Sequence, residues 1–287
     1  MIDALWLALR AAGLALSFQA AGTALFVAVF ARSLGRAGSV IRRTGVRSAC
    51  AALVVLLAQA LCEPARMAGE WAGLGEVALL RLFLGSAAAD TYLVRVMGLA
   101  CVALGLADAR RAPPLLALVG SLAVAGASLV SGHTSVAAHR LLLASLLLTH
   151  LTILAFWFGS LGPLRQLVVR ESPAAAARVL AEFSAVAIWL VPLIALAGAA
   201  TAVLLLPDVA ALARPYGLLL LAKLALFALL MALAALNRLR LAPALARGET
   251  FAALRLRRSL ALEYALICAA FALTAVMTGV FAPTADA

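Results

Sequence analysis

Charged residues are scarce in this 287-residue sequence, at 12% of the chain against about 25% in soluble domains. Hydrophobic residues make up 66% of it and occur in long runs of Leu, Ala and Val. A helix that crosses a bilayer needs about 20 mostly apolar residues, so these runs supply several spans and leave little chain for a separate soluble catalytic unit. The runs also lack the polar and apolar alternation of an outer-membrane barrel. The sequence therefore predicts an all-α, polytopic membrane helix bundle.

Motifs that would indicate other functions are also missing. The four cysteines have neither CxxC nor CxxxC spacing, which disfavours a zinc site and structural disulfides. The sequence contains no nucleophile elbow, Walker loop, GxGxxG fingerprint, HExxH or Ser/His/Asp set. The net charge of +11 comes from arginines that cluster between apolar runs, as in multispan proteins. We therefore predict a protein that is not an enzyme and does not bind nucleic acid.

Proline, glycine and charge clusters divide the chain into eight predicted transmembrane helices. The segment between the second and third is too polar to cross the membrane and is expected to lie on its surface as an amphipathic piece, over 63–90. The whole chain, 1–287, is predicted to be a single integral membrane domain, and a weak internal similarity suggests halves 1–130 and 131–287. The eight predicted spans lie near 4–31, 46–62, 91–107, 114–131, 138–161, 180–206, 215–237 and 259–281.

The arginines are distributed unevenly over the connections between these spans. Sixteen of them fall on one set of alternate connections, within 32–47, 110–111, 165–178 and 238–258. Connections rich in Lys and Arg remain in the cytoplasm. We therefore predict that both termini and the 132–138 connection face away from the cytoplasm.

All three histidines fall within eighteen positions of the sequence, as His133, His139 and His150. The first two belong to the predicted outer mouth, whereas His150 lies about 16 Å deeper, near the bilayer midplane. Eleven residues are close to three helical turns, so His139, His150 and also Trp157 share one face. Ionisable groups within a membrane are costly and usually face a cavity or a partner, and neutral imidazole is a good ligand for Cu, Zn, Fe and Ni. The three histidines are candidate metal ligands; the alternative for His150 is a structural hydrogen bond to a neighbouring helix.

Other residues could help a metal ion along a path through the membrane. Met67 and Met277 would offer soft sulfur donors that favour Cu(I), although methionine is also an ordinary core filler. Lys223 is the only lysine and lies two turns after Tyr216 on the seventh predicted span. Within a membrane it needs a carboxylate, backbone carbonyls or water. Glu263 lies close to the last arginine cluster, where a snorkelling or paired structural charge is the favoured interpretation over a relay.

A series of polar landmarks runs through the second half of the chain, over about 131–281. They are Ser131-Gly132-His133, His150 with Trp157, Gly159, Leu161, Pro163 and Leu164, Glu182-Phe183-Ser184, Tyr216-Gly217, Lys223-Leu224, Asn237-Arg238, Arg255, Arg257, Arg258, Ser259 and Glu263. This ordered set resembles the CopD family of bacterial inner-membrane copper-resistance proteins. The first 130 residues resemble that family only in hydropathy and in Arg95.

The resemblance implies an eight-span protein of the bacterial inner membrane, with periplasmic termini, that moves copper alongside a periplasmic copper-binding carrier. On this chain His133 and His139 would receive the ion at the outer mouth, and His150 would be a deeper ligand with Trp157 packing below it. Because the ligands cluster outside, we expect import from periplasm to cytoplasm. The chain has five methionines and no Met-rich outer tract, which makes the outer imidazoles more important.

Two other functions are compatible with the same residues. Histidines on facing membrane helices can ligate a b-type haem, which would make the protein a redox protein. A membrane partner that anchors a periplasmic copper carrier without transporting the ion would carry the same landmarks. A visible absorption spectrum separates the first of these from a copper permease, and a metal flux assay separates the second.

Overall fold

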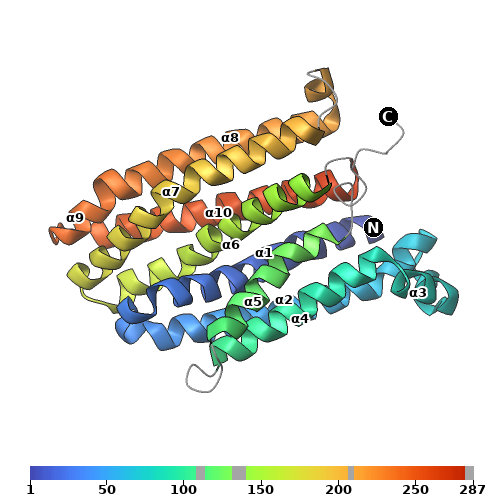
Figure 1. The fold of residues 1–287 in the computed structure, drawn as a ribbon, viewed down its shortest axis with the longest axis horizontal. Helices are drawn as coiled ribbons and strands as arrows, with labels where there is room; N and C mark the ends of the chain where they lie inside the picture. The colour runs from blue at the N-terminus through green and yellow to red at the C-terminus, as the bar shows by residue number, and fades with distance from the viewer. Residues whose placement is uncertain (108–113, 131–139, 206–209, 282–287) are drawn as a thin grey trace.

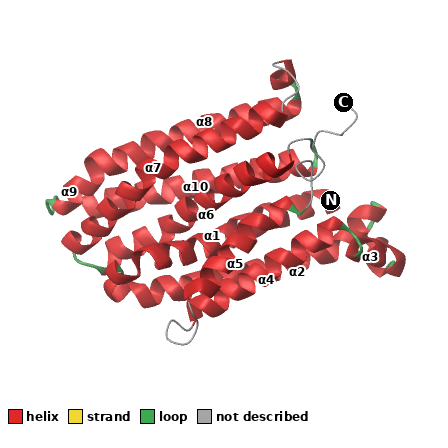
Figure 2. Cartoon of the chain, in the orientation of Figure 1, coloured by secondary structure: helices red, strands yellow, loops and turns green. Residues whose placement is uncertain are grey.

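The computed structural model describes residues 1–107, 114–130, 140–205 and 210–281, and within these ranges the chain forms helices and no strand (Figure 2). Helices satisfy every backbone hydrogen bond within one segment, which a bilayer requires. The helices are α1 Ile2–Phe30, α2 Gly38–Ala68, α3 Val77–Leu84, α4 Ala87–Ala107, α5 Pro114–Gly126, α6 Arg140–Arg170, α7 Pro173–Leu205, α8 Pro215–Leu236, α9 Ala242–Ala246 and α10 Ala252–Gly279.

Seven of these helices are long and apolar enough to cross a membrane, which confirms the predicted polytopic bundle. They match seven of the eight predicted spans in order. The remaining one, predicted near 114–131, is the shorter helix α5, which is extended by the 3-10 turn Ala127–Leu129. At about 1.5 Å per residue, α5 alone covers about 20 Å, less than the roughly 30 Å of hydrocarbon in a typical bilayer.

Helix α2 is much longer than the predicted second span over 46–62. Its first turns contain Arg42, Arg43 and Arg47, because arginine is a good helix former whose long side chain can reach away from the helix. Its last turns take in Glu63 and continue past it to Ala68. The predicted surface segment therefore begins inside α2 and continues through the 3-10 turn Trp71–Gly75 into α3. Exposed apolar side chains on this segment include Trp71, Leu74, Val77, Leu80, Leu82 and Leu84.

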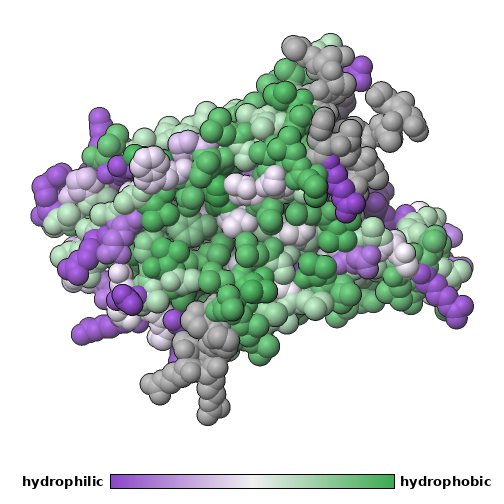
Figure 3. Space-filling model, viewed as in Figure 1, coloured by the Kyte–Doolittle hydropathy of each residue, from purple (hydrophilic) through white to green (hydrophobic). Residues whose placement is uncertain are grey.

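Helix α1 lies at the centre of the bundle (Figure 1). It contacts α2, α4 and α5 on one side and α6 and α10 on the other, while α7 packs on α6 and α8 packs on α10. Hydrophobic residues cover the middle of the visible face, and hydrophilic residues gather toward its two ends (Figure 3). A broad apolar belt of this kind matches the hydrocarbon layer of a bilayer.

Two glycines allow α1 and α6 to cross in direct backbone contact. A Cβ atom on Gly22 would lie 1.7 Å from the carbonyl oxygen of Ala155, and one on Gly159 would lie 2.4 Å from the Cα of Gly22. Beside the crossing, Gln19 Nε2 donates to Thr23 Oγ1 at 3.0 Å and to the Gly159 carbonyl at 3.3 Å. Small residues and buried polar groups are the usual means of joining membrane helices, because lipid tails weaken the hydrophobic drive.

The start of α1 and the end of α10 lie at the same end of the bundle. Arg10 donates to Thr278 Oγ1 at 3.0 Å, and a Cβ atom on Gly279 would meet the Trp6 ring at 2.8 Å. The seven long helices and the shorter α5 together run an even number of times between the two ends of the bundle, so the start of α1 and the end of α10 lie together at one end. We call this the outer end, following the arginine distribution, and the end that carries the α7 start and α9 the inner end; which side of the membrane each faces stays a prediction.

Candidate functional site

His150 lies about a third of the way along α6 and faces α7. Its Nδ1 is 3.1 Å from the carbonyl oxygen of Ile194. A carbonyl can only accept, so Nδ1 carries the proton of this hydrogen bond and a neutral ring keeps its lone pair on Nε2. Metal-binding histidines commonly use one nitrogen for the metal and anchor the other to a carbonyl. The structure thus shows the predicted helix-to-helix hydrogen bond, in a form that leaves one nitrogen available to a metal.

Helices α7 and α8 each contribute one more residue around this imidazole. Gly198 of α7 lies against the ring, since a Cβ atom there would be 3.1 Å from His150 Cε1. Lys223 of α8 acts electrostatically on the same imidazole. A protonated Lys223 repels a cation bound at His150, and this repulsion is half as large for a monovalent ion as for a divalent one.

A cavity of about 340 Å³ lies closer to the inner end, between α6, α7, α8 and α10. Its wall is mostly apolar, and Trp157, Asn237 and Glu263 supply polar groups to it. Glu263 is 2% exposed and accepts hydrogen bonds from Asn237 Nδ2 and from the Trp157 indole. Burying a carboxylate is costly unless hydrogen bonds compensate, and these two donors do so. Glu263 is therefore a buried, hydrogen-bonded carboxyl group whose side chain does not reach the surface.

The position of Asn237 depends on an irregular turn. Residues Asn237–Leu241 form a π-helical turn directly after α8, and Asn237 is buried at its start. Turns of this kind are rare and frequently occur at functional sites. Trp157 lies two turns beyond His150 on α6, about 10 Å along the helix axis, so one helix connects the His150 imidazole to the inner cavity.

The remaining predicted site residues do not gather at this place. Met67 is 46% exposed at the end of α2, Met277 is buried near the end of α10, and Tyr216 is half-buried near the start of α8. His133 and His139 lie outside the described residues. Among the residues that are described, no group of three or more His, Cys, Asp or Glu side chains could hold a metal ion.

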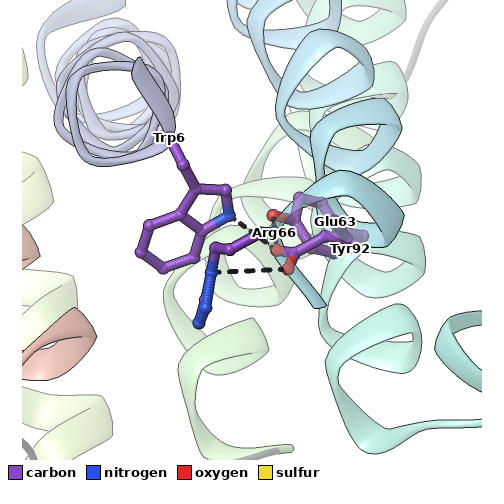
Figure 4. A network of polar contacts seen from close by, with 4 residues as sticks. All are labelled: Trp6, Glu63, Arg66 and Tyr92. Carbon is purple, nitrogen blue, oxygen red and sulfur yellow. Dashed lines mark hydrogen bonds and ion pairs between the residues drawn. The ribbon is translucent and has the colours of Figure 1, made fainter. Parts of the chain in front are cut away.

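A second polar network, at the outer end, was not singled out from the sequence (Figure 4). Glu63 Oε1 accepts from Trp6 Nε1 at 2.8 Å and from the Tyr92 hydroxyl at 2.9 Å. Arg66 lies over the Trp6 ring, with its Cζ 4.1 Å from the ring centroid. This network joins α1, α2 and α4. The members of this network are far apart in the sequence, so no local motif predicts it. The sequence signal that could have found it is the presence of ionisable residues within apolar segments.

Comparison with known proteins adds one finding. The family model of CopD, described as copper resistance protein D, matches residues 177–277. The matched region includes α8, the π-helical turn and nearly all of α7 and α10, and so contains Gly198, Lys223, Asn237 and Glu263. No curated protein and no solved structure matched the chain. The resemblance predicted from the polar landmarks is thereby confirmed over these residues.

Proposed function

We propose that this multi-pass membrane protein, which over residues 177–277 is related to the copper resistance protein D family, carries copper across the bacterial inner membrane through its C-terminal half. The observation that carries the proposal is His150, whose Nδ1 is held by Ile194 and whose Nε2 is available as a metal ligand. The residue is the eleventh of the 31 residues of α6, about 15 Å along the helix from its start.

The proposed path leads from the outer mouth to the inner cavity. His133 and His139 receive the ion from a periplasmic copper-binding carrier, His150 binds it near the midplane, and the cavity beside Trp157 and Glu263 receives it next. Exchange between successive ligands lowers the cost of moving a bare ion through hydrocarbon. The buried carboxyl group of Glu263 supports the inner step, because its oxygens offer a ligand in the cavity that comes next along the path.

Imidazole binds copper in proteins, which fits the ligand to the substrate. We infer import as the direction, since the outermost predicted ligands are histidines on the carrier's side.

Copper uptake into proteoliposomes tests this proposal. His150→Ala should abolish uptake, whereas His133→Ala and His139→Ala should mainly raise the copper concentration needed for half-maximal uptake. The matched control is Ser145→Ala on the same helix, because the Ser145 hydroxyl donates only to Leu142 of its own turn in the described contacts. Size-exclusion profiles confirm that each variant is folded.

Two results would contradict the proposal. Uptake by His150→Ala at the wild-type rate would show that copper does not need His150 as a ligand. A stoichiometric Soret band in the purified wild-type protein, lost in the histidine variants, would identify haem binding and replace copper as the ligand of these residues.

A further inference from the structure

Three arginines from different helices converge at the outer end, away from the proposed copper path. Arg10 of α1 and Arg66 of α2 both lie over the Trp6 ring, with Cζ 5.0 Å and 4.1 Å from its centroid. Arg95 of α4 lies one turn after Tyr92, whose hydroxyl donates to Glu63 Oε1 at 2.9 Å. We call Arg10, Arg66 and Arg95 the outer arginine cluster.

One carboxylate from the described residues, Glu63, faces this cluster. Its Oε1 already accepts from Trp6 and Tyr92, and its Oε2 is 4.0 Å from Arg66 Nε. The other acceptors are neutral hydroxyls, because Arg10 donates to Thr278 Oγ1 at 3.0 Å and Arg95 donates to Ser128 Oγ at 3.2 Å. Positive charge therefore exceeds negative charge at this place.

Several buried donors of the cluster also make no hydrogen bond among the described residues. The Nε atoms of Arg10, Arg66 and Arg95 are buried and make no hydrogen bond in the part of the chain that the structure describes. Buried donors without acceptors and like charges in a poorly polar environment are both costly. An anion would remove both costs at once, and Arg66, whose side chain is 31% exposed, gives it access from outside.

The position of the cluster and its chemistry indicate which anion this is. Guanidinium groups bind phosphate oxygens through paired, charge-assisted hydrogen bonds. Helix α3, which packs on α2 and α4, presents the exposed apolar residues Val77, Leu80 and Leu84 beside this end. Such a helix lies at the level of the lipid head groups.

We propose that the outer arginine cluster is a binding site for a phosphate group, supplied by a phospholipid head group or by free phosphate. Arg66 meets the phosphate first, and Arg10 and Arg95 complete its coordination from α1 and α4. Bound phosphate then joins α1, α2 and α4, while Glu63 keeps its hydrogen bonds to Trp6 and Tyr92. The site is independent of the proposed copper path.

Native mass spectrometry of the delipidated full-length protein tests the proposal. The probes are dioleoyl phosphatidylglycerol, dioleoylglycerol, which has the same chains without phosphate, and inorganic phosphate. Wild-type protein should bind a phosphate-bearing probe, and Arg66→Gln and Arg95→Gln should each weaken that binding about tenfold or more, as expected when charge-assisted hydrogen bonds are lost. The matched control is Arg81→Gln, an exposed arginine on α3 at the same end.

The outcomes separate the sources of the phosphate and decide the proposal. Binding of phosphatidylglycerol but not dioleoylglycerol, lost in the variants, assigns a lipid head group. If inorganic phosphate binds and the two lipids bind equally, the free phosphate ion is assigned as the ligand of the site. Failure of every phosphate-bearing probe to bind, or unchanged binding by Arg66→Gln, overturns the site. If Arg95→Gln does not fold, Arg66→Gln decides, since its guanidinium is partly exposed and its ion pair with Glu63 is long.

Discussion

Glu263 shows how individual residues in this bundle depend on partners from other helices. It lies on α10, its donors come from α6 and from the turn after α8, and it is almost fully buried. A carboxylate so deeply placed costs several kcal/mol unless its oxygens are hydrogen-bonded. The hydrogen bonds from Asn237 and Trp157 therefore hold three helices at fixed positions around the inner cavity.

Replacing one of these donors should lower stability. Trp157→Phe keeps an aromatic ring in the cavity wall but removes the indole N–H, leaving a buried carboxylate oxygen without its donor. We expect a loss of about 1–3 kcal/mol in stability, measured as the free energy of unfolding in detergent. Trp189→Phe is the matched control, because Trp189 is 75% exposed on the adjacent helix α7. Equal effects of the two substitutions would show that the hydrogen bond to Glu263 contributes nothing.

At the residue scale, the sequence anticipated a hydrogen bond from His150 to a neighbouring helix but not its partner. The depth of His150 in the bilayer stays a prediction, and His150 is the eleventh of the 31 residues of α6. The partner Ile194 contributes a backbone carbonyl, which carries no signature in its side chain. Asn237 was one of the CopD-like landmarks, yet its hydrogen bond to Glu263 depends on a π-helical turn that no sequence pattern marked. The outer histidines stay a prediction.

At the scale of helices, the crossing of α1 and α6 determines how the two parts of the bundle meet. Gly22→Ala should separate these helices, because the new Cβ would lie 1.7 Å from a backbone oxygen that no rotamer change can move. We expect a loss of at least about 3 kcal/mol, seen as a lower unfolding midpoint in detergent. Gly13→Ala on the same helix is the control, since its Cβ would meet only side-chain atoms, at 3.6 Å and beyond.

A Gly22→Ala variant as stable as Gly13→Ala would contradict the close crossing. Glycines within membrane spans commonly permit close packing, and Gly22 does so. The sequence does not indicate which helix approaches Gly22, because membrane helices all present similar apolar surfaces. Helix α2 is also longer than the predicted span over 46–62, because Arg42 and Arg43 continue the helix before it and Glu63 continues it beyond.

At the scale of the whole molecule, hydropathy alone predicted the order and approximate limits of the long helices. Each span needs a similar length of apolar chain, so the signal is local and strong. The central place of α1 could not be predicted, because it depends on contacts between helices distant in sequence. The division into halves at about residue 130 stays a prediction.

The orientation of the bundle is the remaining prediction at this scale, and cysteine labelling tests it. In a variant without the four native cysteines, Glu76→Cys and Glu249→Cys each place one thiol in an exposed connection, before α3 and before α10. Because basic connections remain in the cytoplasm, a membrane-impermeant maleimide should label Glu76→Cys in intact spheroplasts and label Glu249→Cys only after permeabilisation. The two sites serve as controls for each other, since both must react once the membrane is opened. The reverse pattern would place the start of α1 and the end of α10 in the cytoplasm and would turn the proposed direction of copper movement from import to export.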